Sequence, residues 1–366
     1  MYSCPCCKDQ RKRLIKTATK PKQAIEKSQA SAGLLAYIAT AKYADSLPLY
    51  RQSIILSRFG IEINRTKLPN WMIKCGQLVP PLINRLEEGL LAQPNIHMNE
   101  TPVQVLNEAG KSAQSKSYMW VPSGGPSGNK AILFDYDPSR SSDVPKRLLA
   151  DYHGSMMVDG YAGYEAACTE QGITRLACWA HARRKFVGAS KAGGKNKKSP
   201  KAEYAIKLIA KLYAIEKEIK DEPVDVRYQR RQQGSKKIIS KLGKWLNETR
   251  PQVAPKLALG KALYYLDHQW SRLVACLDDG RYPIDNNAVE NAIRPFAIGR
   301  KNWLFSSSVQ GAKASANLYS LIETAKDNGL EPYAYLKLVF TALPNVATYD
   351  DDTLLPNNIR SHHESR

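Results

Sequence analysis

The chain has 366 residues, enough for two or three domains, and its 54 Lys and Arg residues outnumber its 34 Asp and Glu residues. The net charge of +20 and the sequence pI near 9.5 favour a polyanionic partner such as nucleic acid, although a protein of the membrane surface or the ribosome would show the same balance. No apolar run approaches the roughly 18 residues that span a bilayer, and none follows the basic N-terminus as in a signal peptide. We therefore expect a cytoplasmic protein without a membrane segment.

Residues 1–30 are basic and poor in large apolar side chains, which is typical of a solvated arm or tether. Cys4 and Cys7 have the two-residue gap of one zinc knuckle. A structural zinc site needs four ligands, and no second Cys or His pair lies nearby, so zinc binding by Cys4 and Cys7 is expected to be weak. The seven cysteines form no regular framework and are expected to be mostly thiols.

Residues 31–92 have apolar side chains at helical spacing, with predicted helices near 34–38, over 50–59 and over 65–90. Gly60 follows the second of these as a glycine that ends a helix. Helices joined by a short glycine turn suit a helix-turn-helix, and a plain helical hairpin with solvated lysines is the alternative. In the first case the candidate DNA contacts are Arg65, Lys67 and Lys74.

Residues 93–186 change to short runs of β-branched and aromatic residues, at 102–107, 117–121 and 130–136, which predict antiparallel strands. A helical stretch over 140–151, a strand ending near Asp159, a helix over 162–170, a strand over 173–179 and another helix follow. This alternation predicts a mixed sheet with helices packed on it, an α/β fold.

Asp159 comes at the carboxyl end of a strand, where an open α/β sheet places its ligands, although Asp-Gly is also a common turn pair. Further along, Cys178 and His181 stand two residues apart and precede a basic run that suits contact with a DNA backbone. Two ligands fall short of a closed zinc site, and core packing is the alternative for both. The basic run consists of Arg183, Arg184 and Lys185.

Residues 187–281 predict an all-helical segment, in which Pro223, Gly234 and Pro251 separate the helices. Its arginines could line a DNA path. Those considered are Arg227, Arg230 and Arg231.

Residues 282–305 read YPIDNNAVENAIRPFAIGRKNWLF. Asp285 is a good N-cap and Pro295 cannot continue a helix, so we predict a short amphipathic helix between them. Its apolar face would hold Ala288, Val289, Ala292 and Ile293, and its polar stripe would hold Asn286, Asn287, Glu290 and Arg294. Arg300 and Lys301, beyond this helix, are candidate phosphate contacts, and residues 341–366 are expected to form a polar tail that frays beyond residue 356.

The stretch DNNAVENAIRPFAIGRKNWLFSSSVQGAKASANLYSLIETAK closely resembles the signature of insertion-sequence transposases of the IS66 type, and KYADSLPLYRQ resembles the N-terminal helical region of that family. The resemblance implies an RNase H-like core over 93–186 and 282–340, interrupted by the helical insertion, with an Asp-Asp-Glu triad that holds Mg²⁺ or Mn²⁺. Glu290 matches the third acid and Asp159 the second. Asn99 stands where the family has the first Asp, within Met98-Asn99-Glu100-Thr101-Pro102.

An amide oxygen at residue 99 can ligate a metal but brings no negative charge, and Glu100 points to the opposite face of a strand. We therefore expect a weakened metal site. The family also implies that residues 1–30 hold the second half of a zinc-ribbon-like region, which predicts that this chain lacks the N-terminal portion of the family. Both departures would fit a decayed or partial copy of the element.

The sequence thus predicts a DNA transposase acting on the terminal inverted repeats of its element and on target DNA in the bacterial nucleoid. A homo-oligomer on DNA and accessory proteins of the same element are further expectations. The alternatives are a non-catalytic DNA-binding remnant or regulator of transposition, and a general basic nucleic-acid binder.

Overall fold

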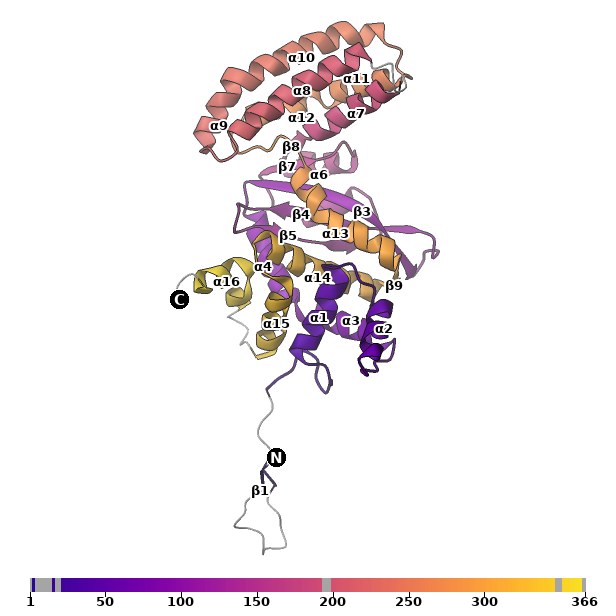
Figure 1. The fold of residues 1–366 in the computed structure, drawn as a ribbon. Helices are drawn as coiled ribbons and strands as arrows, with labels where there is room; N and C mark the ends of the chain where they lie inside the picture. The colour runs from indigo at the N-terminus through magenta and orange to yellow at the C-terminus, as the bar shows by residue number, and fades with distance from the viewer. Residues whose placement is uncertain (1, 4–14, 17–20, 193–198, 346–350, 364–366) are drawn as a thin grey trace, which may run out of the picture.

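The computed structural model describes residues 2–3, 15–16, 21–192, 199–345 and 351–363. Three layers are stacked along the long axis of the molecule: helices from the two ends of the chain, a mixed sheet, and helices from the middle of the chain (Figure 1). One large hydrophobic core joins the sheet to the terminal helices, and a second core lies within the middle helices. The predicted α/β class with a helical insertion is confirmed. None of the described helices combines the length and the apolar character that crossing a membrane requires.

The N-terminal helices begin and end at residues that local chemistry explains. Ser31 caps the first helix by accepting a hydrogen bond from the Leu34 N–H at 3.2 Å, and Gly60 follows the second helix with φ of +74°. The single helix predicted over 65–90 is wrong, because Pro80 has no N–H to donate and a new helix begins there. The described elements are a strand pair, β1 (Tyr2–Ser3) and β2 (Ile15–Lys16), and helices α1 (Ala32–Tyr43), α2 (Leu49–Arg58), α3 (Lys67–Leu78) and α4 (Pro80–Leu91).

The main sheet has the strand order β5-β4-β3-β7-β8, with β6 also paired to β4 and β9 to β3. The pairs of β4 with β3, β5 and β6 are antiparallel, as predicted, whereas β7 and β9 run parallel to β3 and β8 runs parallel to β7. The strands are β3 (Asn95–Asn107), β4 (Lys116–Gly124), β5 (Ala131–Ile132), β6 (Asp135–Asp137), β7 (Ser155–Val158), β8 (Thr174–Ala177) and β9 (Ser306–Ser308).

Helices cover both faces of this sheet, and side chains of β3 reach them alternately. Glu100 contacts Tyr164 of a helix on one face, and Thr101 contacts Arg300 of a helix on the other. Below the sheet in Figure 1, helix α14 (Val309–Asp327) packs closely on α3, since a Cβ at Gly76 of α3 would lie 2.5 Å from Ala314 of α14. These helices are α5 (Asp143–Leu148), α6 (Gly163–Gln171), α13 (Asn287–Trp303), α14 (Val309–Asp327) and α15 (Pro332–Ala342).

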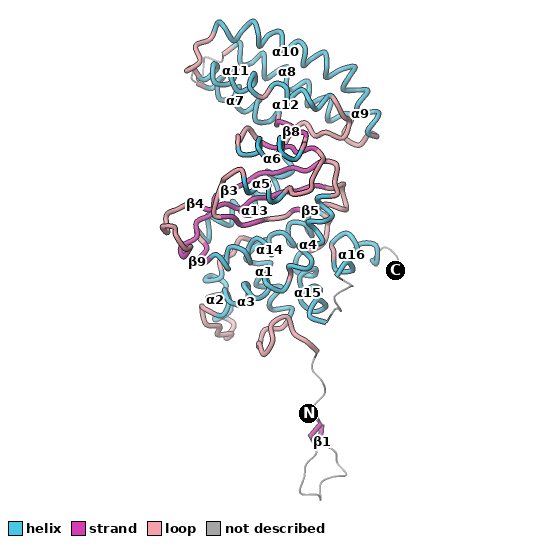
Figure 2. Tube along the Cα trace, turned by 180° about the vertical axis from the view of Figure 1, so that it is seen from behind, coloured by secondary structure: helices cyan, strands magenta, loops and turns pink. Residues whose placement is uncertain are grey.

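The middle of the chain is all helical, as predicted, and its helices stack beyond the β8 edge of the sheet (Figure 2). The core of this helical segment is formed by apolar residues such as Leu212, Leu242 and Leu263. Helix α7 (Trp179–Lys191), the first helix after β8, also contributes side chains to this core. The elements are α7 (Trp179–Lys191), α8 (Pro200–Glu218), α9 (Val224–Arg230), a π-helical turn (Arg231–Ser235), α10 (Lys236–Thr249), α11 (Ala258–His268) and α12 (Trp270–Val274), with short 3-10 turns at Arg250–Gln252 and Ala275–Leu277.

Helix α13 corrects the prediction of a short helix that stops before Pro295. The helix continues through Pro295 to Trp303, so the missing N–H removes one hydrogen bond to the preceding turn. Burial of Val289, Ile293 and Phe296 in the core offsets that loss.

The C-terminal segment corrects a second prediction, that the chain frays beyond residue 356. The described part ends in helix α16 (Pro356–His363), preceded by 3-10 turns at Leu343–Asn345 and Asp351–Leu354. Leu354 and Ile359 are buried in the main core, which holds this helix in place.

Candidate functional site

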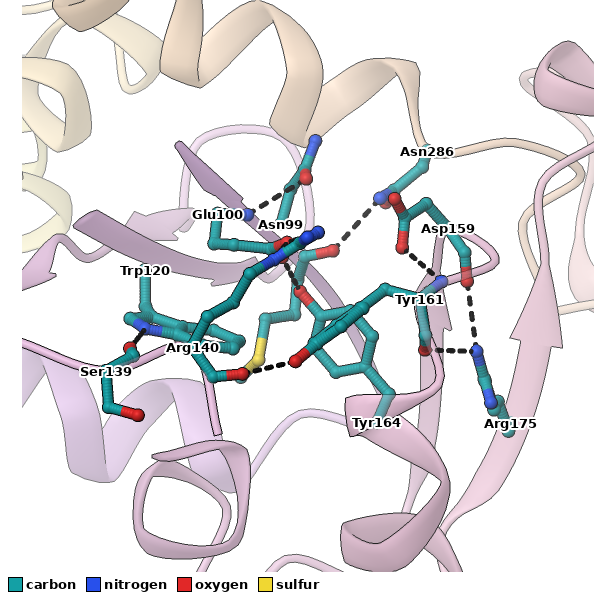
Figure 3. Close-up of polar contacts among 11 residues, drawn as sticks. Asn99, Glu100, Trp120, Ser139, Arg140, Asp159, Tyr161, Tyr164, Arg175 and Asn286 are labelled. Carbon is teal, nitrogen blue, oxygen red and sulfur yellow. Dashed lines mark hydrogen bonds and ion pairs between the residues drawn. The ribbon is translucent and has the colours of Figure 1, made fainter. Parts of the chain in front are cut away.

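The register of the two central parallel strands brings Asn99 and Asp159 level with each other. His97 of β3 pairs with Met157 of β7, so two residues further Asn99 stands beside Asp159, the first residue after β7. Asn99 lies within β3, because this strand begins at Asn95 rather than at residue 102. Figure 3 shows Asp159 beside Asn286 at the start of α13, and the Asn99 side chain, whose Oδ1 accepts a hydrogen bond from the Glu100 N–H at 2.9 Å. The predicted position of Asp159 at a strand end is confirmed.

The turn that carries Asp159 is fixed by hydrogen bonds. The Asp159 carboxylate accepts from the Tyr161 N–H at 2.8 Å, and Arg175 donates to the carbonyl oxygens of Asp159 and Tyr161 at 3.1 and 2.9 Å (Figure 3). Asp159 therefore forms an Asx-type turn and also faces the site. The turn interpretation of this residue is confirmed, and its role in a site stays a prediction.

Glu100 points away from Asn99, as strand alternation predicts, and its side chain is 2% exposed. It accepts hydrogen bonds from Tyr164 and Arg140, which come from the opposite side of the sheet (Figure 3). Burial raises the pKa of Glu100, and the Tyr164 and Arg140 hydrogen bonds act against that rise. Glu100 is thus engaged in the core and does not face the same side of β3 as Asn99.

The start of α13 is anchored by Asn286, which was predicted to lie in the polar stripe of this helix and instead packs against β3. Asn286 is fully buried. Its Nδ2 donates to the Met98 carbonyl at 3.0 Å, its Oδ1 lies 3.0 Å from His97 Nδ1, and its backbone N–H donates to Cys178 Sγ at 3.2 Å. One residue therefore joins α13 to β3 and to the start of α7.

The predicted apolar face of this helix is confirmed in part. Val289, Ala292 and Ile293 are buried as expected, but Ala288 is exposed. Asn287 is exposed and contacts Asp285 in its own turn, at 2.7 Å.

Glu290, in the first turn of α13, meets the first turn of α7. Its Oε1 lies 3.4 Å from His181 Nε2, and its Oε2 accepts from Arg184 at 3.1 Å. Cys178 Sγ belongs to the same cluster, in which the ligand atoms of Cys178, His181 and Glu290 all lie within 4.8 Å of one another. Cys178 and His181 are therefore brought together with the third predicted acid.

The electrostatics of this cluster follow from burial. Burial lowers the pKa of His181, while the carboxylates of Glu290 and Asp159 act to raise it, so both predicted acids influence the same imidazole. Burial raises the pKa of the Cys178 thiol to about 11. Asp159 is not among the groups that make up the ligand cluster in the described part of the chain.

The candidate DNA contacts lie in different places. Arg183 and Lys185 are exposed on α7 beside Arg184, and Arg294 and Lys301 are exposed on α13. Arg300 is instead bound to β3, where it donates to Thr101 Oγ1 at 3.1 Å and to the Pro102 carbonyl. On the N-terminal helices Lys67 and Lys74 are exposed, and the Arg65 guanidinium lies over the Tyr50 ring at 4.5 Å from its centroid. Cys4 and Cys7 lie outside the described residues.

Arg231 corrects another expectation, since it does not line a DNA path. Its side chain is fully buried and forms two hydrogen bonds with the Glu216 carboxylate, at 2.8 and 2.7 Å. It also donates to the Cys276 and Asp279 carbonyls at 2.9 and 3.0 Å. This arginine holds the insertion together.

Sequence reasoning missed that His97 and Asn286 connect the strand of Asn99 to the helix of Glu290. The paired Asn286-Asn287 at the start of the helix was the available signal, but helical spacing placed both in one polar stripe with Glu290 and did not separate the buried Asn286 from the exposed Asn287. Sequence reasoning also treated Cys178 and His181 separately from Glu290, because they precede it by 112 and 109 residues in the sequence.

The fold is that of a mixed α/β protein. Its candidate site lies where the parallel strands β7 and β8 end, beside helix α13, which carries Glu290. Comparison with known families makes this specific, because the chain belongs to the IS66 transposase family. The family model described as Transposase IS66 family matches residues 27–314, and that described as IS66 C-terminal element matches residues 320–356.

Two relatives come from Sinorhizobium fredii (strain NBRC 101917 / NGR234). The uncharacterized protein y4jD is 33% identical, over 98% of this chain and 71% of its own length. The uncharacterized protein y4qI is 32% identical, over 89% of this chain and 62% of its own length. The chain thus spans roughly two thirds of the length of these relatives.

Proposed function

We propose that this protein is a DNA transposase whose cleavage and strand-transfer site is formed by Asn99, Asp159 and Glu290. The observation that carries the proposal is the β3–β7 register, which sets Asn99 level with Asp159 beside the helix that bears Glu290. The order of the sheet, with three antiparallel strands followed by two parallel ones, supports an RNase H-like core. Membership of the IS66 family supports DNA at the element ends as the partner.

The donor set fits a hard divalent cation in part. Asp159 and Glu290 offer carboxylate oxygens and Asn99 an amide oxygen, which are ligands that Mg²⁺ and Mn²⁺ accept. Glu290 Oε1 is buried without a hydrogen-bond partner among the described residues, and its contact with His181 Nε2 is long at 3.4 Å, so this oxygen can bind a cation. A bound cation would polarise the phosphodiester and favour attack by water and then by a 3′ hydroxyl.

The protein groups around this site have separate tasks. Asn286 holds α13 against β3 and so fixes the position of Glu290 relative to Asn99. Arg184 is largely exposed and pairs with Glu290, and it is placed to contact a DNA phosphate near the acids. Arg183 and Lys185 extend this basic surface along α7. We expect the protein to act as a homo-oligomer on DNA, together with accessory proteins of the same element.

The second candidate function is a non-catalytic DNA-binding protein that regulates transposition. Asn99 is the observation that favours it, because an amide supplies no negative charge to neutralise a divalent cation. Both functions would use the same basic surfaces to bind DNA. They differ in whether Asp159 and Glu290 bind a divalent cation and support cleavage.

The test is Mg²⁺- or Mn²⁺-dependent cleavage of a labelled element-end duplex by the natural chain, by Asn99→Asp and by Asn99→Asp combined with Glu290→Gln. We expect cleavage to rise with Asn99→Asp and to be lost when Glu290→Gln is added, with DNA binding by mobility shift nearly unchanged in all three. Asn287→Ala, combined with Asn99→Asp, is the control, because Asn287 lies in the same helical turn as Glu290 and its side chain is exposed. This variant should cleave and bind DNA like Asn99→Asp alone.

Loss of DNA binding with Glu290→Gln would show that Glu290 is structural and contradict its proposed role. Absence of cleavage by every version, with specific binding of the terminal repeats retained, would favour the regulatory function. Binding without any preference for those repeats would leave only the general nucleic-acid binder.

A further inference from the structure

Cys178, His181 and Glu290 form a compact cluster whose atoms are of the types that bind zinc. Cys178 directly precedes α7, and His181 follows three residues later, so the two side chains lie on one face of the first turn. Glu290 reaches them from the first turn of α13. Their ligand atoms all lie within 4.8 Å of one another.

The spacing of these atoms is close to that of a tetrahedral site. Zinc binds His nitrogen and carboxylate oxygen at about 2.0–2.2 Å and thiolate sulfur at about 2.3 Å, which places neighbouring ligand atoms of a tetrahedron roughly 3.3–3.8 Å apart. The distance of 3.4 Å between His181 Nε2 and Glu290 Oε1 already falls in this range. Side-chain movement of about 1 Å would bring the sulfur to the same spacing.

The surroundings are also those of a binding site. Cys178 is fully buried, and its sulfur accepts a hydrogen bond from the backbone N–H of Asn286 at 3.2 Å, which orients it and favours the thiolate. His181 Nδ1 and Glu290 Oε1 are buried polar atoms without a hydrogen-bond partner in the described part of the chain. Buried polar atoms without partners are uncommon, and a cation would satisfy the carboxylate oxygen.

We propose that Cys178, His181 and Glu290 form a site for Zn²⁺, with three protein ligands and one open position. This site goes beyond the proposed function, because thiolate and imidazole select a softer ion than the Mg²⁺ or Mn²⁺ proposed for Asp159 and Glu290. Glu290 is common to both sets of ligands. Zinc bound here therefore competes with the hard cation for this carboxylate.

Two features of the cluster change when zinc binds. The charge of the bound ion weakens the ion pair between Arg184 and Glu290 Oε2, so the 60% exposed Arg184 side chain becomes available for contact with DNA. Cys178 binds as the thiolate, so its proton passes to solvent on coordination. Neither change requires movement of the backbone that carries the ligands.

The test is a titration with Co²⁺ as a probe for zinc, followed by absorption spectroscopy. All samples carry Cys4→Ser, Cys6→Ser and Cys7→Ser in the full chain, so that these thiols do not contribute. We expect one equivalent of Co²⁺ to give a thiolate-to-cobalt charge-transfer band with intense visible bands of a four-coordinate ion, and one equivalent of Zn²⁺ to remove them. Cys178→Ser should abolish the charge-transfer band.

Cys168→Ser is the matched control, because the Cys168 thiol is also buried with a pKa raised to about 11, and its loss should leave the spectrum unchanged. His181→Ala is a second variant, at a residue that is only partly buried, and it should weaken Co²⁺ binding about 10-fold or more. The absence of a charge-transfer band, its persistence in Cys178→Ser, or unchanged affinity in His181→Ala would each overturn the site. These outcomes are read without DNA, so they are separate from failure of the transposase proposal.

Discussion

Asn286→Ala is expected to destabilise the core that carries the candidate site. The change removes the donor to the Met98 carbonyl and the partner of His97 Nδ1, both in buried surroundings. Leaving one such group unsatisfied costs about 1–3 kcal/mol, so the two together predict a loss of about 2–6 kcal/mol in the free energy of unfolding. Since α13 starts at this anchor, Glu290 should lose its fixed position as well.

Urea unfolding followed by far-ultraviolet circular dichroism measures this loss, with Asn287→Ala as the control. Asn287 is exposed and its side chain bonds with Asp285 in the same turn, so its removal should change stability by about 0.5 kcal/mol or less. A loss below about 1 kcal/mol for Asn286→Ala, or equal losses for the two variants, would refute the view that Asn286 ties α13 to β3.

Two further predictions concern charged groups inside the protein. Arg231→Met should destabilise the insertion by about 3–5 kcal/mol, because it leaves Glu216 buried without its partner, and adding Glu216→Leu should recover most of this loss in the same unfolding assay. No recovery in the double variant would contradict this account. Burial lowers the pKa of Lys42 to about 8, below its ordinary 10.5, so the unfolded chain binds more protons between these values and stability rises with pH from about 8 to about 10.5. Lys42→Met should remove up to about 3 kcal/mol of that rise, measured as the difference between the unfolding free energies at pH 7.5 and 10.5, and an unchanged difference would show that the folded state does not lower the pKa of Lys42.

Much of the fold could be predicted from the sequence because the signals are local. The change from helical to alternating apolar patterns located the sheet, and Gly60 marked a helix end. Strand alternation also gave the correct face for Glu100, opposite to that of Asn99. Each of these depends on residues that are neighbours in the chain.

Other predictions failed where distant residues compensate a local preference. Pro295 was expected to end a helix, but the core packing of α13 outweighs one lost hydrogen bond. Arg231 was considered as a residue lining a DNA path, because its sequence neighbourhood does not reveal that Glu216 and two carbonyl groups surround it.

The sequence by itself determined the family, through its signature stretch, and it predicted the acids and the departure at residue 99. Only the tertiary structure decided which of these groups meet. It set Asn99 level with Asp159 through a parallel strand pair, and it brought Glu290 to Cys178 and His181 rather than into direct contact with Asp159. Ligand sets of this kind depend on the packing of α13 against β3 and of the start of α7 against the start of α13. That packing is fixed by buried contacts such as those of Asn286, which local periodicity does not encode.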